Sequence, residues 1–233
     1  YALRPAMSKE EFIKEVTTGL TPPPAYFPLN VLMNIKGYDS IDTVMERGQH
    51  AMTAQEFDAA ANETGAIVLD TRHESKFVKE HIPNSIFIGL DGTFAPWVGT
   101  MMPDIKQEIL LVAEPGHEAE AITRLARVGY DFCIGYLKGG LDSWKNAGFE
   151  TATIESVQVS QLVEKAKDAA IIIRDVRRKG EYDSEHVVDA QNAPLDYINE
   201  SMLKVDKNKK YFVHCASGYR SVIFASVLMA RGY

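Results

Sequence analysis

The sequence predicts an α/β protein made of two tandem three-layer domains with parallel sheets. The main observation is an internal repeat: residues 68–72 recur as residues 173–177, each with an Asp-x-Arg triplet. A histidine follows each of these aspartates after 11 residues, and a leucine after 20. Each copy also alternates short apolar runs with amphipathic stretches, which is typical of a parallel sheet and its helices. The chain has 233 residues, 45% apolar and 24% charged, which is enough for two domains of about 100 residues each.

The repeat divides the chain into residues 1–48, 49–151 and 152–233. In the first part we expect a helix after Ser8, because Ser8 and Glu11 have the spacing of a capping box. The three prolines at 22–24 end that helix and enforce an extended segment. The chain has no initiator methionine and no signal-peptide pattern, and it starts like the middle of a longer protein.

The first copy predicts the order helix, strand, strand, helix, strand, helix. Thr53 and Glu56 form a second capping box at the start of its first helix. Residues 67–69 and 109–112 are continuous apolar runs, typical of buried parallel strands. Residues 132–134 predict one more strand before the final helix.

The second copy repeats this order. We expect Ser160 to cap a helix, residues 171–173 and 211–213 to form strands, and a further helix to begin near Ser221. The copy stops at Tyr233, so by comparison with the first copy we expect its last strand and helix to be missing. Such a truncation would put the stability of the second domain at risk.

A loop suited to nucleophilic catalysis separates the last predicted strand from the last helix. A loop of this length can turn backbone N–H groups inward at a helix N-terminus and bind an anion. The positive potential of these N–H groups and of the helix N-terminus favours the thiolate form of a cysteine over the thiol, so Cys215 is a candidate nucleophile. Arg220 adds a positive charge beside it. The residues expected to bind the substrate around this pair are Ala216, Ser217, Gly218, Tyr219 and Ser221.

Neither the other cysteine nor the matching loop of the first copy predicts catalysis. Cys133 lies inside an apolar strand with no adjacent base, and we expect it to pack in the core. Glu114 occupies the position of Cys215, 15 residues before the next Gly-Tyr pair, against 17 in the second copy. We expect its carboxylate to fill the place of the anion. Pro115 also removes one donor, so the first copy should be inactive.

Three residues of the second copy are expected to support the loop rather than to react. Asp175 and Arg177 follow a buried strand and have exact counterparts in the first copy, which favours a structural ion pair. His186 is repeated in the same way and is also interpreted as structural.

Three further charged or titratable side chains of the second copy are considered as neighbours of the cysteine loop. His214 precedes Cys215 on the strand and should point to the opposite face, so it is a poor general base for the thiol. Arg178 and Glu181 are expected near the mouth of the pocket.

The motifs together resemble those of rhodanese-type sulfurtransferases. The resemblance rests on the paired Asp-x-Arg, on His-Ile-Pro-Asn-Ser at 81–85, on Gly-Gly-x-x-x-Trp at 139–144 and on the Cys-x-x-x-x-Arg-Ser loop. It covers both copies. It implies that Cys215 takes a sulfur atom from thiosulfate or another sulfane donor, carries it as a persulfide and passes it to a thiol or cyanide. A tandem of one inactive and one active domain fits the same family.

Residues 1–48 resemble the C-terminal tail of a metallo-β-lactamase-like domain, through Phe12, the proline-rich stretch 22–28 and Asn34-x-x-Gly37-Tyr38. The whole chain therefore resembles the C-terminal portion of bacterial fusions of a persulfide dioxygenase-like domain with tandem rhodanese domains. The His-rich metal motif of such a domain is not in this sequence. We expect no cofactor and no metal in this chain; iron or zinc would belong to the preceding domain.

Other functions remain as alternatives. A docking or oligomerisation module is one of them, and a homo-oligomer is left open. A Cys-dependent phosphatase or arsenate reductase is less favoured, because those enzymes use Cys-x5-Arg and this loop has four intervening residues. The net charge of −7 without a basic stripe argues against nucleic acid, and no apolar run is long enough to span a membrane. Two cysteines without a disulfide framework favour the cytoplasm.

Overall fold

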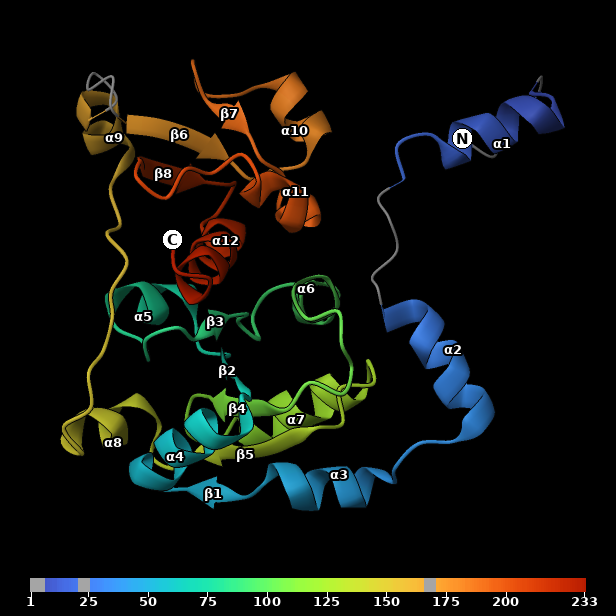
Figure 1. Ribbon diagram of the computed structural model, residues 1–233. Coiled ribbons are helices and arrows are strands. Elements are labelled where there is room, and N and C mark those ends of the chain that lie inside the picture. Colours follow the sequence, from blue (N-terminus) through green and yellow to red (C-terminus); the bar gives the residue numbers. More distant parts are fainter. Residues whose placement is uncertain (1–6, 21–25, 166–170) are drawn as a thin grey trace.

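The computed structural model describes residues 7–20, 26–165 and 171–233. It confirms the predicted α/β fold with two domains in tandem, each built on a parallel sheet (Figure 1). The sheet of the first domain has five strands and that of the second has three among the residues described.

The N-terminal part consists of three helices, α1 (Lys9–Thr17), α2 (Tyr26–Lys36) and α3 (Ile41–Gly48). The predicted capping box at Ser8 is present, because Ser8 Oγ accepts the N–H of Glu11 and the Glu11 carboxylate accepts that of Ser8. The proline segment 22–24 lies outside the described residues. Helix α3 packs against the first domain through Val44, which is 1% exposed.

The first domain contains the predicted strands and helices together with two further strands and two further helices, so that strands and helices alternate throughout. Its elements are β1 (Ala51–Met52), α4 (Ala54–Thr64), β2 (Ile67–Asp70), α5 (Glu74–Lys79), β3 (Ile86–Phe87), α6 (Phe94–Met101), β4 (Ile109–Val112), α7 (Glu118–Ala126), β5 (Cys133–Leu137) and α8 (Gly140–Asn146). The strand order is β1-β5-β4-β2-β3, all parallel.

Strand β4 shows why this domain has three layers. Ile109 and Leu111 belong to one hydrophobic cluster, whereas Leu110 and Val112 belong to another. Alternate residues of a strand face opposite sides, so both faces of the sheet are covered by helices. A continuous apolar run in the sequence is the signature of that arrangement.

The second domain repeats the central strands of the first. Its elements are α9 (Val159–Lys165), β6 (Ile171–Asp175), α10 (Lys179–Ser184), β7 (Gln191–Asn192), a 3-10 helix (Leu195–Tyr197), α11 (Ile198–Met202), β8 (Lys210–His214) and α12 (Tyr219–Ala230). The order β7-β6-β8 matches β3-β2-β4 of the first sheet.

Two helices in this domain begin about two residues before the predicted positions, which is about half a turn. Ser160 lies inside the first turn of α9 instead of capping it, and the N–H of Gln158 is satisfied by the side chain of Gln161. Helix α12 begins at Tyr219 rather than near Ser221, because Gly218 takes a positive φ of 106° and serves as the cap residue. The backbone turn therefore decides where the helix starts.

The Asp-x-Arg pairs make the same contacts in both domains. Arg72 binds both carboxylate oxygens of Asp70, at 2.6 to 3.1 Å, and donates to the carbonyl of Glu80. Arg177 binds Asp175 at 2.6 to 3.0 Å and donates to the carbonyl of Glu185. Each pair thus joins the end of a strand to the end of the following helix.

The repeated histidines are also equivalent. His81 Nδ1 lies 2.8 Å from the carbonyl of Phe77, and its ring stacks on the Phe77 ring. His186 has the same distance to the carbonyl of Tyr182 and stacks on that ring. These contacts fix the turn after the helix and leave each Nδ1 engaged with the backbone.

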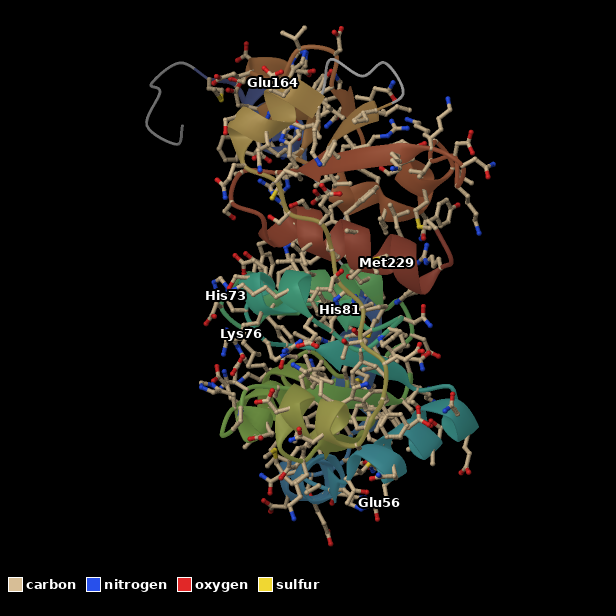
Figure 2. The ribbon with its side chains drawn as sticks, turned by 90° about the vertical axis from the view of Figure 1, so that its left-hand side faces the viewer. Glu56, His73, Lys76, His81, Glu164 and Met229 are labelled. Atoms are coloured by element: carbon tan, nitrogen blue, oxygen red, sulfur yellow. The ribbon has the colours of Figure 1, made fainter. Side chains whose placement is uncertain are left out.

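Helix α12 lies between the two domains (Figures 1 and 2). The hydroxyl of Ser226 accepts the N–H of Phe87 on β3 at 3.0 Å, and the hydroxyl of Tyr219 donates to the carbonyl of Gly89 at 2.6 Å. Buried side chains of α12, such as Phe224, belong to the same cluster as Phe87. The helix that follows the cysteine loop is therefore part of the core of both domains.

We predict that Ser226→Ala destabilises the chain by about 1–3 kcal/mol, because it leaves the buried N–H of Phe87 without an acceptor. Urea unfolding measures the effect. Ser160→Ala, on the exposed face of α9, is the matched control and should change the midpoint urea concentration of unfolding little. Equal midpoints for the two variants would contradict the role given to Ser226.

Candidate functional site

The cysteine loop is joined to the first turn of α12 by contacts to the sulfur. Cys215 directly follows β8 and is partly buried, and its thiol is free. The N–H of Gly218 donates to Cys215 Sγ at 3.2 Å, and Ser221 Oγ lies 3.7 Å from the same sulfur. Ser221 also donates to the carbonyl of Gly218 at 2.8 Å, which closes the turn.

The sulfur lies at the N-terminus of a 12-residue helix. Free N–H groups and the helix dipole at such an end favour negative charge. Ala216 and Ser217 are exposed at the tip of the loop. Gly218 provides the backbone contact to the sulfur, so one of the predicted donors is in place, and a positive φ at this position explains why it is a glycine.

Arg220 is engaged in a two-point ion pair that the sequence did not predict. Its two terminal nitrogens lie 2.7 and 2.8 Å from the carboxylate oxygens of Glu181 on α10. Arg220 lowers the pKa of Glu181 from 4.5 to about 2, so this carboxylate stays charged at neutral pH. Glu181, and less strongly Cys215, raise the pKa of Arg220. The positive charge beside the sulfur is therefore largely balanced.

A second ion pair extends this network. Arg178 Nε lies 3.2 Å from Asp196, and the N–H of Arg178 donates to the Glu181 carboxylate at 3.1 Å. Asp196 was not singled out in the sequence. The repeat could have indicated it, because Leu195-Asp196 corresponds to Leu90-Asp91 in the first copy.

His214 points away from the sulfur, as the alternation of the strand requires. Its Nε2 lies 3.7 Å from Asp175, on the other side of the sheet from Cys215. Nε2 makes no hydrogen bond within the described part of the chain. His214 is thus placed with the structural pair Asp175–Arg177 rather than with the thiol.

Tyr219 was expected to bind the substrate, but its side chain is packed on the first domain. Its ring packs edge-on against Phe87 at 5.6 Å and its hydroxyl reaches Gly89. A Cβ at Gly92 would lie 2.2 Å from this ring, so only glycine leaves room for it. Tyr219 therefore anchors the helix on the first domain, and burial raises its pKa.

The loop of the first domain differs from the expectation for Glu114. One oxygen of its carboxylate is bound by Lys76 at 2.7 Å, and the other is buried without a hydrogen-bond partner among the described residues. Neither oxygen accepts an N–H group of its own loop. The N–H of Gly116 is taken by the side chain of Glu118 at 2.8 Å. No nucleophile lies in this loop. Cys133 is fully buried, and burial raises the pKa of its thiol to about 12, which fits a core residue.

The described ranges contain no cluster of three or more His, Cys, Asp or Glu side chains that could hold a metal ion. Nor does any helix among these residues have the length and apolar character required to cross a membrane.

Comparison with known proteins defines the class. The family model for the rhodanese-like domain matches residues 53–147 and 158–233, which together exceed half of the chain. The chain therefore belongs to the family of rhodanese-like domain proteins.

Two curated relatives match one stretch each. The chain is 33% identical over 78 residues to the thiosulfate sulfurtransferase GlpE of Coxiella burnetii, covering 33% of this chain and 73% of that protein. It is 40% identical over 67 residues to a tRNA sulfurtransferase of Thermoplasma acidophilum, covering 28% of this chain but only 13% of that protein.

Among solved structures, a thiosulfate sulfurtransferase from Pseudomonas aeruginosa aligns over 77% of this chain and 38% of its own length, with 22% identity and a TM-score of 0.38. The SseA sulfurtransferase from Escherichia coli aligns over 78% and 93%, with 15% identity and a TM-score of 0.38.

The pair Arg220–Glu181 should make the stability of the chain depend on acid. Because the pKa of Glu181 falls from 4.5 to about 2 on folding, its contribution is complete above pH 4.5 and is lost as the pH falls towards 2. We predict that Glu181→Gln reduces the loss of stability between pH 5 and pH 3 in urea unfolding. Glu200→Gln, on the exposed face of α11, is the control and should lose stability with acid as the wild type does. If Glu181→Gln showed the same pH dependence as the wild type, the acid sensitivity could not be assigned to the Arg220–Glu181 pair.

Proposed function

We propose that this protein is a sulfurtransferase that moves sulfane sulfur through a persulfide on Cys215 to a thiol or another nucleophilic acceptor. The observation that carries the proposal is the free Cys215 sulfur at the N-terminus of α12, contacted by the N–H of Gly218. Membership of the rhodanese-like family and the sulfurtransferase names of the matched relatives support it.

In the proposed first step, the Cys215 thiolate attacks the outer sulfur of a small sulfane donor such as thiosulfate. The S–S bond of the donor breaks, and sulfite leaves with the electron pair. Cys215 then carries the terminal sulfur as a persulfide anion. The N–H groups of the loop, from Ala216 to Ser221, are the proposed donors to this anion, since the helix N-terminus favours negative charge.

In the second step, an acceptor thiolate attacks the terminal sulfur. The bond to Cys215 breaks, the Cys215 thiolate is restored, and the acceptor leaves as a persulfide. The proton of the acceptor thiol passes to solvent. Arg220 contributes to both steps through its charge, but Glu181 offsets most of it, so we propose a supporting role.

The size of the loop supports sulfur over phosphorus or arsenic oxyanions. Four residues separate Cys215 from Arg220, one fewer than in the Cys-x5-Arg loops of phosphatases and arsenate reductases. In addition, Arg220 is bound to Glu181 rather than directed at a free oxyanion position. The role of these domains within a larger persulfide-metabolising fusion is a further proposal that rests on the resemblance of residues 1–48 alone.

A docking role fits the first domain specifically. Its equivalent loop has no nucleophile, whereas its strand β3 and the Gly89 carbonyl hold α12. We propose that the first domain supports the active loop of the second.

We predict an order of effects on the rate of sulfur transfer from thiosulfate to a thiol. Cys215→Ser should abolish transfer, because the hydroxyl is not available as an anion near neutral pH. Arg220→Ala should slow transfer without abolishing it, since the N–H contact from Gly218 remains. His214→Ala should have the smallest effect, because its side chain faces Asp175.

Circular dichroism and urea unfolding establish that each variant is folded before rates are compared. A folded His214→Ala variant as damaged as Cys215→Ser would replace the proposed mechanism by a Cys–His pair. Full activity in Cys215→Ser would exclude the persulfide at this position.

A further inference from the structure

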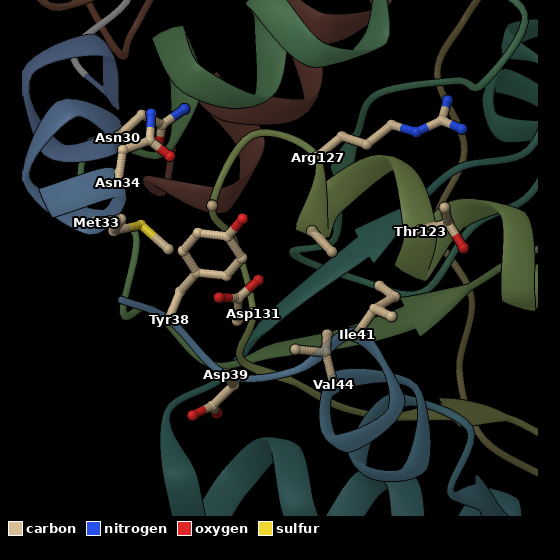
Figure 3. A pocket seen from close by; sticks show the side chains of 12 residues that line it. Asn30, Met33, Asn34, Tyr38, Asp39, Ile41, Val44, Thr123, Arg127 and Asp131 are labelled. Carbon is tan, nitrogen blue, oxygen red and sulfur yellow. The ribbon is translucent and has the colours of Figure 1, made fainter. Parts of the chain in front are cut away.

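A crevice of about 420 Å³ lies between the N-terminal helices and the first domain, away from the cysteine loop (Figure 3). Helix α2 forms one side with Asn30 and Met33, and the segment leading into α3 contributes Tyr38. The opposite side comes from the end of α7 and from Asp131, just before β5. The volume is that of a site for a small molecule.

The unusual group in this crevice is the carboxylate of Asp131. Asp131 is only 7% exposed, and its carboxylate accepts no hydrogen bond from any residue that the structure describes. Burial, and then the charge of Asp39, raise its pKa. The Asp131 oxygens are not among the buried side-chain atoms that lack a partner, so they are open to the crevice that Asp131 lines. A carboxylate in a largely buried residue, with no protein donor, is available to a donor that enters the crevice.

The nearest cation does not satisfy this carboxylate. Arg47 donates to the main-chain carbonyl of Asp131 at 2.8 Å and binds the side chain of Asp39 at 2.8 Å. Arg127 lines the crevice as well, but it is exposed, and no ion pair with Asp131 occurs in the described ranges. The Asp131 carboxylate therefore faces the cavity without a direct ion-pair partner among the described residues, although the charge of Arg47 acts on it from a distance.

The remaining walls fit an apolar stem and an amine. Met33, Ile41 and the buried Val44 provide apolar surface. The Tyr38 ring lies beside Asp131 in Figure 3 and can face a cation. Asn30 Oδ1, packed against Gly129, is a further acceptor without a partner among the residues described. The side-chain amides of Asn30 and Asn34 and the Tyr38 hydroxyl also line the crevice, and each can donate as well as accept. Asp131 is the lining carboxylate without an ion-pair partner among the described residues, so it is the group that favours a cationic ligand.

We propose that this crevice is a binding site for a small molecule that carries a primary ammonium group on a short apolar stem. The ammonium donates to the Asp131 carboxylate, and the stem packs between Met33, Val44 and the Tyr38 ring. The site is separate from the sulfur-transfer loop and does not depend on the proposed activity.

Titration of the full chain by amide NMR tests the proposal, with n-butylammonium chloride as the probe and butan-1-ol as its uncharged control. We expect butylammonium to shift the amides of Asn30, Gly129 and Asp131. We expect butan-1-ol to bind about tenfold more weakly or not at all, because it lacks the charge that Asp131 requires.

Asp131→Asn keeps the shape of the side chain and should weaken butylammonium binding about tenfold. Tyr38→Ala, at a position that is 68% exposed, leaves the core intact and should weaken it severalfold by removing the ring. Asp142→Asn, on the exposed face of α8, is the matched control and should bind as the wild type does. Equal binding of butylammonium and butan-1-ol, unchanged binding in both Asp131→Asn and Tyr38→Ala, or no binding of either probe would overturn the proposal.

Discussion

The hydrogen bonds between α12 and the first domain are the constraint on which the candidate site depends. Ser226 and Tyr219, seven residues apart on one helix, bind the backbone at Phe87 and Gly89 in and just after β3. The same helix begins at Gly218, whose N–H contacts the Cys215 sulfur, and it carries Arg220. The position of Cys215, the proposed nucleophile, is therefore set partly by the first domain, whose equivalent loop contains no cysteine.

This arrangement gives the duplication a physical meaning. Both copies retain the pairs that close the strand–helix turn, Asp70–Arg72 and Asp175–Arg177, because these support the fold in either place. The loops have diverged instead. The first copy pairs Glu114 with Lys76, while the second keeps a free cysteine at a helix N-terminus. One domain then serves as support and the other carries the chemistry in the function we propose.

Much of this could be predicted from the sequence, and the failures have particular causes. Apolar runs such as 109–112 and the capping box at Thr53 predicted their elements because those signals are local. The partner of Arg220 and the orientation of Tyr219 could not be predicted, because Glu181 is 39 residues away and Gly89 is 130 residues away. The crevice at Asp131 depends on the packing of α2 and α3 on the domain, which no motif records.

The central claim is that sulfur is carried on Cys215, and mass spectrometry of the intact chain and its peptides tests it most directly. After exposure to thiosulfate and removal of excess donor, the account predicts one added sulfur atom on the peptide that contains Cys215. A thiol acceptor should remove this sulfur, and Cys215→Ser should not gain it. An unchanged mass in the wild type, or a sulfur located on Cys133 instead, would contradict the account.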